Sequence, residues 1–277
     1  MKKSNSSYIP LVLTSLFLLA AITVAIVSIK EARGKEKQTI SQSLTGVNIM
    51  KTPLPKPTNK LDLGNWKLTL PVGSSDNPTE ITQPKLDSFE YNPWFVATSE
   101  TNTLKFRAAV NGVTTSGSDY PRSELREMIN NKTKASWSSE SGVHSMYIDQ
   151  AIMAVPNTKK DVVAGQIHDD EKDIIVTRLD YPVLHIRVDG TNVHTLDPDY
   201  VLGRRFNIKF VVEDNQTKVY YNNGTEPVYI LSKDYSEAYF KAGVYPQSNC
   251  EKEKAKSLCN SDNYGEVVIY NIEVKHQ

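Results

Sequence analysis

Residues 206–213 read Phe206-Asn-Ile-Lys-Phe-Val-Val-Glu213, with apolar side chains at every second position. Successive side chains of a β-strand point to opposite faces, so this spacing places Phe206, Ile208 and Phe210 on the same face. The polar residues between them fall on the other face. The stretch therefore predicts a strand with one buried face and one face in water.

Alternation of the same kind recurs in residues 104–110, 184–189 and 268–275. In the last of these segments, it predicts that Val268, Tyr270, Ile272 and Val274 share one face. Turn sequences separate such segments, among them Asp189-Gly190, Asp214-Asn215 and Asn222-Asn-Gly224. One-sided strands at this short spacing indicate an all-β fold, an antiparallel jelly roll of two stacked sheets. Two short helices are expected, near residues 231–239 and 251–258.

The charges of the chain balance. Its 277 residues hold 32 Lys and Arg against 32 Asp and Glu, so the formal net charge is zero. Global electrostatics therefore does not favour nucleic acid as a partner. Attraction for a polyanion has to come from a local cluster of cations.

The N-terminal part differs in composition from the rest. Residues 9–29 carry no charge and are long enough to span a bilayer, so residues 1–29 are either a cleaved signal peptide or a retained membrane anchor. Basic residues follow the span, which by the positive-inside rule argues against outward display. We still favour an extracellular protein, secreted or anchored at its N-terminus. Residues 30–60 end in Thr52-Pro-Leu-Pro-Lys-Pro-Thr58 and are expected to form a linker before a domain at residues 61–277.

The chain has two cysteines, Cys250 and Cys259. In an exported protein they are expected to close a small loop as a disulfide, whereas in a cytosolic protein they would be free thiols. Two cysteines without clustered histidines do not make a structural zinc site. We expect neither a metal nor a cofactor.

Three short strings place reactive side chains on single strand faces. They are Arg122-Ser-Glu-Leu-Arg126, Gln166-Ile-His168 and Tyr239-Phe-Lys-Ala-Gly-Val-Tyr-Pro-Gln247. In each string the polar groups alternate with small or apolar ones that would face a core. Guanidinium, amide, imidazole, ammonium and phenol groups on neighbouring strands suit a ligand that bears carboxylates.

Together with the opening Trp66-Lys-Leu-Thr-Leu-Pro71, these strings resemble alginate lyases of polysaccharide lyase family seven. The resemblance covers residues 61–275, in the family's order. It implies a jelly roll with a concave groove, alginate as the anionic polysaccharide bound there, and cleavage by elimination. We expect a monomer.

The resemblance also implies roles for the residues of the strings. A lyase removes the C5 proton beside the uronate carboxylate and expels the C4 oxygen. Arg122 and Gln166 would neutralise the carboxylate, His168 would take the proton and Tyr245 would protonate the leaving oxygen. The expected contacts to neighbouring sugars come from Arg126, Tyr239, Lys241 and Gln247. Glu124, counted with this substrate-binding set, is expected to orient Arg122 or Arg126.

Substrate preference follows from analogy alone. In guluronate the C5 proton and the C4 oxygen lie on opposite sides of the ring, which calls for both His168 and Tyr245. In mannuronate they lie on the same side, and Tyr245 could serve both. Ile167, between Gln166 and His168, accompanies guluronate-containing substrates in the family. We therefore expect cleavage within chains that contain guluronate or mixed blocks.

Two other functions stay open from the sequence. A glycoside hydrolase on a similar sandwich needs two carboxyl groups across the scissile bond, and no string presents such a pair. A non-catalytic carbohydrate-binding jelly roll would need the arginines and tyrosines but not Gln166 with His168. The acidic run after His168, residues 169–173, is expected to be a turn. His144, His185 and His194 are interpreted as structural.

Overall fold

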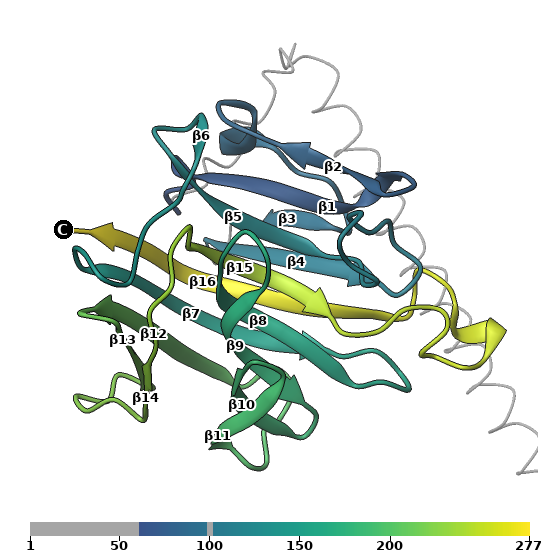
Figure 1. The fold of residues 1–277 in the computed structure, drawn as a ribbon. Helices are drawn as coiled ribbons and strands as arrows, with labels where there is room; N and C mark the ends of the chain where they lie inside the picture. The colour runs from purple at the N-terminus through teal and green to yellow at the C-terminus, as the bar shows by residue number, and fades with distance from the viewer. Residues whose placement is uncertain (1–60, 99–101) are drawn as a thin grey trace, which may run out of the picture. The chain divides into compact units, whose positions relative to one another are not determined.

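The computed structural model describes residues 61–98 and 102–277, and in this range the regular secondary structure is almost entirely β-strand (Figure 1). The strands form two antiparallel sheets that are stacked on each other, which confirms the predicted jelly roll. The signal peptide or anchor at 1–29 and the linker at 30–60 lie outside the described residues. No helix among the described residues is long and apolar enough to cross a membrane.

The first sheet carries all three strings. Its strand order is β11 (Thr191–Asp197), β10 (Val183–Val188), β9 (Asp173–Asp180), β8 (Asp161–His168), β15 (Tyr239–Pro246), β5 (Ser123–Ile129), β1 (Trp66–Ser74) and β2 (Asn77–Ile81), with β6 (Thr133–Lys134) paired to β5. The Gln-Ile-His string ends β8, and the other two strings run along β15 and β5. These three strands are neighbours at the centre of the sheet.

The second sheet contains the stretch that opened the sequence analysis. Its order is β14 (Tyr229–Ser232), β13 (Gln216–Tyr221), β12 (Arg205–Glu213), β7 (His144–Ala154), β16 (Tyr264–His276), β4 (Thr103–Ala109) and β3 (Phe95–Thr98). Two 3-10 turns, η1 (Lys85–Ser88) and η2 (Lys256–Leu258), complete the described elements. The expected turns at Asp189-Gly190 and Asp214-Asn215 are two-residue hairpin loops with positive φ at both positions.

The core lies between the inner faces of the sheets. Apolar side chains that meet there include Leu68, Leu125, Ile167 and Phe240 from the first sheet and Phe106, Ile148, Phe210 and Ile269 from the second. All are fully buried, and burial of such a side chain contributes about 1.5–3 kcal/mol relative to exposure. The alternation of residues 206–212 is confirmed, because Phe206, Ile208, Phe210 and Val212 are all buried.

For residues 268–275, the prediction of which side chains face the core is wrong in the first half of the segment. Val267 and Ile269 are buried, whereas Val268 and Tyr270 are only half-buried. The register with β7 shifts between Ile269 and Asn271, so a β-bulge inserts Tyr270 into the strand. One extra residue reverses the alternation, and Ile272 returns to the core.

Neither expected helix forms as predicted. Residues 233–238 run irregularly between β14 and β15, because their backbone groups pair with other segments. Lys233 N donates to Asn215 O, and Tyr235 O accepts from Ser139 N. In residues 251–258 only the short turn η2 is helical. The Asn249 side chain accepts from the backbone N–H groups of Glu251 and Lys252, which favours turns.

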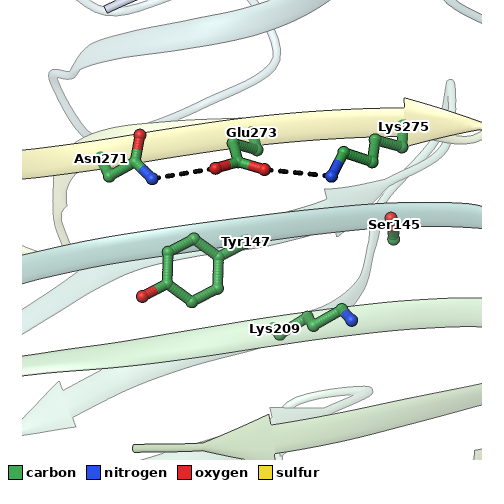
Figure 2. A pocket seen from close by; sticks show the side chains of 6 residues that line it. All are labelled: Ser145, Tyr147, Lys209, Asn271, Glu273 and Lys275. Atoms are coloured by element: carbon green, nitrogen blue, oxygen red, sulfur yellow. Dashed lines mark hydrogen bonds and ion pairs between the residues drawn. The ribbon is translucent and has the colours of Figure 1, made fainter. Parts of the chain in front are cut away.

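Two sheet faces point away from the core. The cationic face is the side of the first sheet that carries Arg122, Glu124, Arg126 and Lys241. The outer face is the corresponding side of the second sheet. It bears a hollow of about 330 Å³ on strands β7, β12 and β16 (Figure 2), lined by Ser145, Tyr147, Lys209, Asn271, Glu273 and Lys275.

Candidate active site

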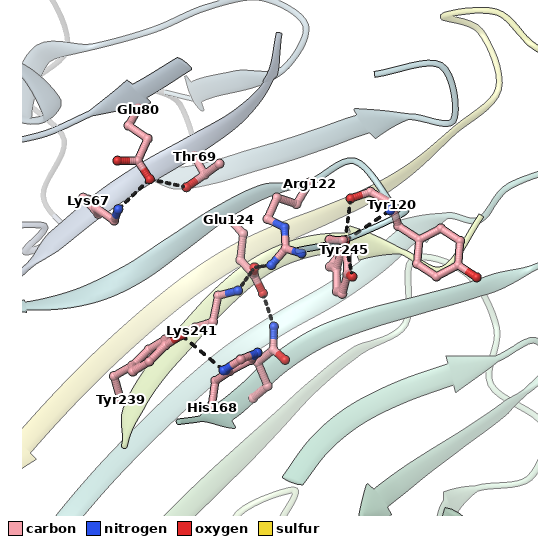
Figure 3. A network of polar contacts seen from close by, with 12 residues as sticks. Lys67, Thr69, Glu80, Tyr120, Arg122, Glu124, His168, Tyr239, Lys241 and Tyr245 are labelled. Carbon is pink, nitrogen blue, oxygen red and sulfur yellow. Dashed lines mark hydrogen bonds and ion pairs between the residues drawn. The ribbon is translucent and has the colours of Figure 1, made fainter. Parts of the chain in front are cut away.

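Strand register brings the three strings together on the cationic face. Lys241 on β15 lies opposite Arg126 on β5 and opposite Gln166 on β8. Tyr239 lies opposite His168, and residue 243 lies opposite Glu124. Polar residues from all three strings therefore lie together, among them Glu124, His168 and Lys241 (Figure 3).

Two glycines shape the strands at this point. The register between β8 and β15 shifts between Lys241 and Tyr245, where Gly243 adopts φ +134°. A Cβ atom on Gly243 would lie 2.5 Å from the carbonyl oxygen of Ser123, so no other residue fits. Gly165 on β8 has φ +101°, and the buried Gln150 donates to the neighbouring Ala164 carbonyl at 2.8 Å. The irregular backbone is thus supported from the second sheet.

Glu124 is the centre of the cluster. Its side chain is 1% exposed, and one carboxylate oxygen lies 2.7 Å from Lys241 Nζ and 3.3 Å from an Arg122 nitrogen. The other oxygen accepts from Gln166 Nε2 at 2.5 Å. Burial acts to raise the pKa of Glu124, but Lys241 and Arg122 outweigh it and hold the pKa below its usual value. An ionised, fully occupied Glu124 fits the predicted orienting role toward Arg122.

Lys241 is buried beneath the face. Burial, together with the nearby Arg122, lowers its pKa to about 8, although Glu124 opposes the shift. Two cations therefore share one carboxylate. This arrangement leaves an excess of positive charge in a poorly solvated place, which an anionic ligand would neutralise.

Arg122 keeps donors for such a ligand. Its guanidinium stacks on the Tyr245 ring at 3.9 Å and, among the described residues, donates a hydrogen bond to Glu124 alone. Its Nε atom has no partner among the described residues. A guanidinium has five N–H donors, so a planar carboxylate can be bound without displacing Glu124.

His168 lies at one end of the cluster. Its Nδ1 contacts the Asp169 carbonyl oxygen and, at 3.1 Å, the hydroxyl of Tyr239. A carbonyl only accepts, so neutral His168 carries its proton on Nδ1 and presents the Nε2 lone pair. Burial, and then the charge of Lys241, lower the pKa of His168 below 6.5. The ring is therefore neutral and basic at pH 7.

Tyr245 lies at the other end of the cluster. Its hydroxyl is 2.7 Å from Ser118 Oγ, which in turn accepts from the backbone N–H of Tyr120. Ser118 and Tyr120 belong to the connection between β4 and β5, and sequence reasoning missed both. No pattern in residues 111–121 points to the site, because contacts from loops leave no periodicity.

The remaining predicted residues occupy the margins. Arg126 stacks on the Tyr239 ring at 3.7 Å and does not reach Glu124, so the expectation that Glu124 orients Arg126 finds no contact. Gln247 lies just beyond Tyr245, with its side-chain nitrogen 3.5 Å from the Tyr245 carbonyl. Lys67, which the sequence analysis did not select, lies opposite Arg126 and pairs with Glu80 at 2.5 Å.

The acidic run after His168 is a turn, as predicted. The Asp169 carboxylate accepts from the backbone N–H groups of Glu171 and Lys172. Within residues 61–98 and 102–277, no group of three or more His, Cys, Asp or Glu side chains is arranged to hold a metal ion.

Comparison with known proteins agrees with this geometry. A sequence model described as alginate lyase matches residues 61–276. The chain belongs to the alginate lyase family. An alginate lyase from Klebsiella pneumoniae is 24% identical, in an alignment that covers 80% of this chain and 92% of that protein.

Solved structures of alginate lyases share the fold. The alginate lyase from Corynebacterium sp. is 46% identical, with a TM-score of 0.75 over 80% of this chain and 98% of that one. Alginate lyase AlgAT5, from polysaccharide lyase family 7, is 45% identical, with a TM-score of 0.74 over the same shares. This alginate lyase is thus a polysaccharide lyase, and its jelly roll is that of its structural relatives.

The disulfide that the sequence predicts for this chain is present. Cys250 and Cys259 are bonded, and the described residues contain no free cysteine. The bond closes the loop that follows β15 and therefore lies just beyond Tyr245 and Gln247 in the chain.

Proposed function

We propose that the protein cleaves alginate by β-elimination on the cationic face and that it belongs to polysaccharide lyase family seven. One observation carries this proposal: Glu124 holds Arg122, Lys241 and Gln166 in one buried cluster, with His168 at one end and Tyr245 at the other. Such a cluster combines a carboxylate-binding centre with two separate groups that exchange protons.

The cluster addresses the difficult part of the reaction. A uronate carboxylate is a poor electron sink, so its charge has to be neutralised before the C5 proton becomes acidic. Arg122 and Gln166 supply hydrogen-bond donors, and the ammonium of Lys241 adds positive charge from below. Because Glu124 and the strands fix them, these groups need little reorganisation when charge develops.

Two residues would move protons. Neutral His168 takes the C5 proton on Nε2, while its Nδ1–H stays on the Asp169 carbonyl. Tyr245 gives its phenolic proton to the departing C4 oxygen, and Ser118 holds the hydroxyl in place at 2.7 Å. The C5–H and C4–O bonds break, and a C4–C5 double bond forms beside the carboxylate.

The separation of base and acid favours guluronate. Tyr239, opposite His168, lies six positions before Tyr245 on β15, with the Glu124 cluster between them. Proton removal from one side and donation from the other suit guluronate, whose C5 proton and C4 oxygen lie on opposite faces. Structures of the 26% identical alginate lyase A1-II′ hold a product written GGG and a substrate written GGMG, which supports guluronate-containing or mixed blocks.

We also propose that the enzyme cleaves within chains and acts outside the cytoplasm. The Cys250–Cys259 bond supports export, because disulfides persist in oxidising compartments. Secretion and attachment through residues 1–29 would both be compatible with this location.

Ultraviolet absorbance during incubation with polyguluronate tests the function. A C4–C5 double bond conjugated to a carboxylate absorbs, whereas products of hydrolysis do not. We expect absorbance and reducing ends to appear together, with a chelator present, because the cluster itself supplies the neutralising charge. Release of reducing ends without absorbance would indicate a hydrolase, and binding without either would indicate a carbohydrate-binding module.

A further inference from the structure

A second cationic site lies beyond the C-terminal end of β15. A hollow of about 530 Å³ is lined on one side by the connection from β7 to β8 and on the other by the disulfide-closed loop. Four lysines surround it, Lys159 and Lys160 from the first segment and Lys252 and Lys254 from the second. Their charges outnumber those of Asp161 and Glu251, the two acidic residues of the lining.

The lysines are held in place by a buried carboxylate. Glu253, between Lys252 and Lys254, is 1% exposed and accepts from the backbone N–H groups of Thr158 and Lys159. It also accepts from Ser248 and Asn263 side chains. Because Glu253 is anchored in the interior, the lysines on either side of it extend into water, and the disulfide closes the same loop.

Three of these lysines have ammonium groups that no carboxylate of the described residues neutralises. Lys160, Lys252 and Lys254 are exposed, and none forms an ion pair with another described residue. Lys159 pairs with Asp161 at 3.1 Å, but Asp161 also accepts from Arg178 at 2.7 Å. The one carboxylate that faces the lysines from β8 is therefore shared between two cations, and the site keeps a net positive charge.

The hollow continues from the cationic face. Val163 on β8 lies opposite Tyr245, and two residues earlier on the same face is Asp161, which lines the hollow. Gln247 N donates to the Asp161 carbonyl oxygen at 2.9 Å, so the chain after Tyr245 runs directly to the lysines. Lys252 and Lys254 therefore lie beyond Tyr245 at this end of β15, where a polymer bound along the cationic face would extend.

We infer that this lysine hollow is an accessory subsite that binds uronate carboxylates of the alginate chain several sugars away from the reacting bond. The inference rests on the proposed function. Binding at a remote subsite holds a long chain through a second contact but gives nothing to an oligomer that ends before it. The subsite therefore selects for chain length and not for the chemistry at C5.

The test is the double variant Lys252→Gln with Lys254→Gln. Its control is Lys132→Gln with Lys134→Gln, which removes two exposed charges in and next to β6. Strand β6 pairs with the C-terminal end of β5, away from Tyr245. Two exposed charge contacts to the polymer are lost, so KM for long polyguluronate should rise about 2- to 30-fold in the first variant only. Its kcat/KM for a trisaccharide should equal that of wild type.

Affinity electrophoresis in gels that contain alginate provides a readout that does not need catalysis. With Tyr245→Phe as the background, the Lys252/Lys254 variant should be retarded less by alginate than the equally charged control. Equal retardation of the two would overturn the inference, as would an equal change in KM for trisaccharide and polymer. If wild type forms no unsaturated product but retardation still depends on Lys252 and Lys254, the proposed function fails and the binding site stands.

Discussion

The cationic face and the outer face contain similar side chains in different arrangements. On the outer face, Tyr147 and Tyr220 flank Lys209 in one cross-strand row, and the cations beside them have their own carboxylates. Arg205 pairs with Asp149. Lys275 pairs with Glu273, as Figure 2 shows. On the cationic face, Arg122 and Lys241 share the single buried Glu124 (Figure 3).

Burial separates the faces further. Side chains of the outer-face pairs reach 57% exposure at Arg205 and 65% at Lys275, so water screens their charges. Side chains of the central cluster are 12% exposed at Arg122 and 8% at Lys241. Residue types alone therefore do not identify the active site. Buried cations that share one carboxylate do identify it.

Tyrosine substitutions should give the largest difference between the faces. Tyr245→Phe removes the acid and should lower kcat on polyguluronate by about 100-fold or more, since a general acid contributes 10² to 10⁴. Tyr147→Phe is the matched change on the outer face and should leave kcat unchanged. Initial rates of unsaturated-product formation measure both. Equal rates for the two variants would remove Tyr245 from the reaction.

Removal of the central carboxylate, that of Glu124, should have the next largest effect, a decrease in the free energy of unfolding. Glu124→Gln leaves Lys241 buried without a counter-ion, which typically costs about 3–5 kcal/mol of unfolding free energy. Glu273→Gln breaks an exposed pair and should cost less than about 1 kcal/mol. Urea unfolding of both variants tests the difference. Similar midpoints would mean that Glu124 does not hold the cluster.

Deprotonation of Lys241 on the cationic face should be visible in the dependence of kcat/KM on pH. Since the pKa of Lys241 is about 8, its ammonium is present below that pH and is lost above it. We expect kcat/KM to fall about tenfold at one pH unit above this pKa. Lys241→Arg stays charged, so its alkaline limb should disappear. An unchanged limb in Lys241→Arg would assign that ionisation to another group.

The smallest effect is expected from the outer-face pair itself. Arg205→Gln removes the ion pair with Asp149 and the stacking on Tyr270 at 4.2 Å. Its unfolding free energy should change by less than about 1 kcal/mol, and kcat/KM should stay at the wild-type value. A loss of activity here would show that the second sheet takes part in substrate binding.

Much of this comparison could be predicted from the sequence, because period-two alternation fixes which side chains share a face. It predicts that Arg122, Gln166, His168 and Tyr245 share one side of adjacent strands. In the structure Arg122 stacks on Tyr245 and pairs with Glu124, Gln166 donates to the same carboxylate, and His168 lies opposite Tyr239. Alternation fails wherever a bulge inserts a residue, as at Tyr270.

Other features depend on contacts that carry no periodic signal. The hydroxyl contact of Ser118 with Tyr245 comes from a loop, and the Lys67–Glu80 pair depends on how β1 meets β2. The burial of Glu253 follows from the packing of its loop, although the residues on both sides of it in the sequence are lysines. Such positions are set by tertiary packing, which a strand pattern does not encode.

Calorimetric titration of Tyr245→Phe tests most directly whether the cationic face recognises a uronate through its charge. The ligands are a guluronate trisaccharide and the same trisaccharide with its carboxyl groups reduced to alcohols. Charge-assisted hydrogen bonds contribute about 1.5–3 kcal/mol each, so two of them predict binding of the uronate at least about 100-fold tighter. Equal affinity for the charged and the neutral trisaccharide would contradict the account.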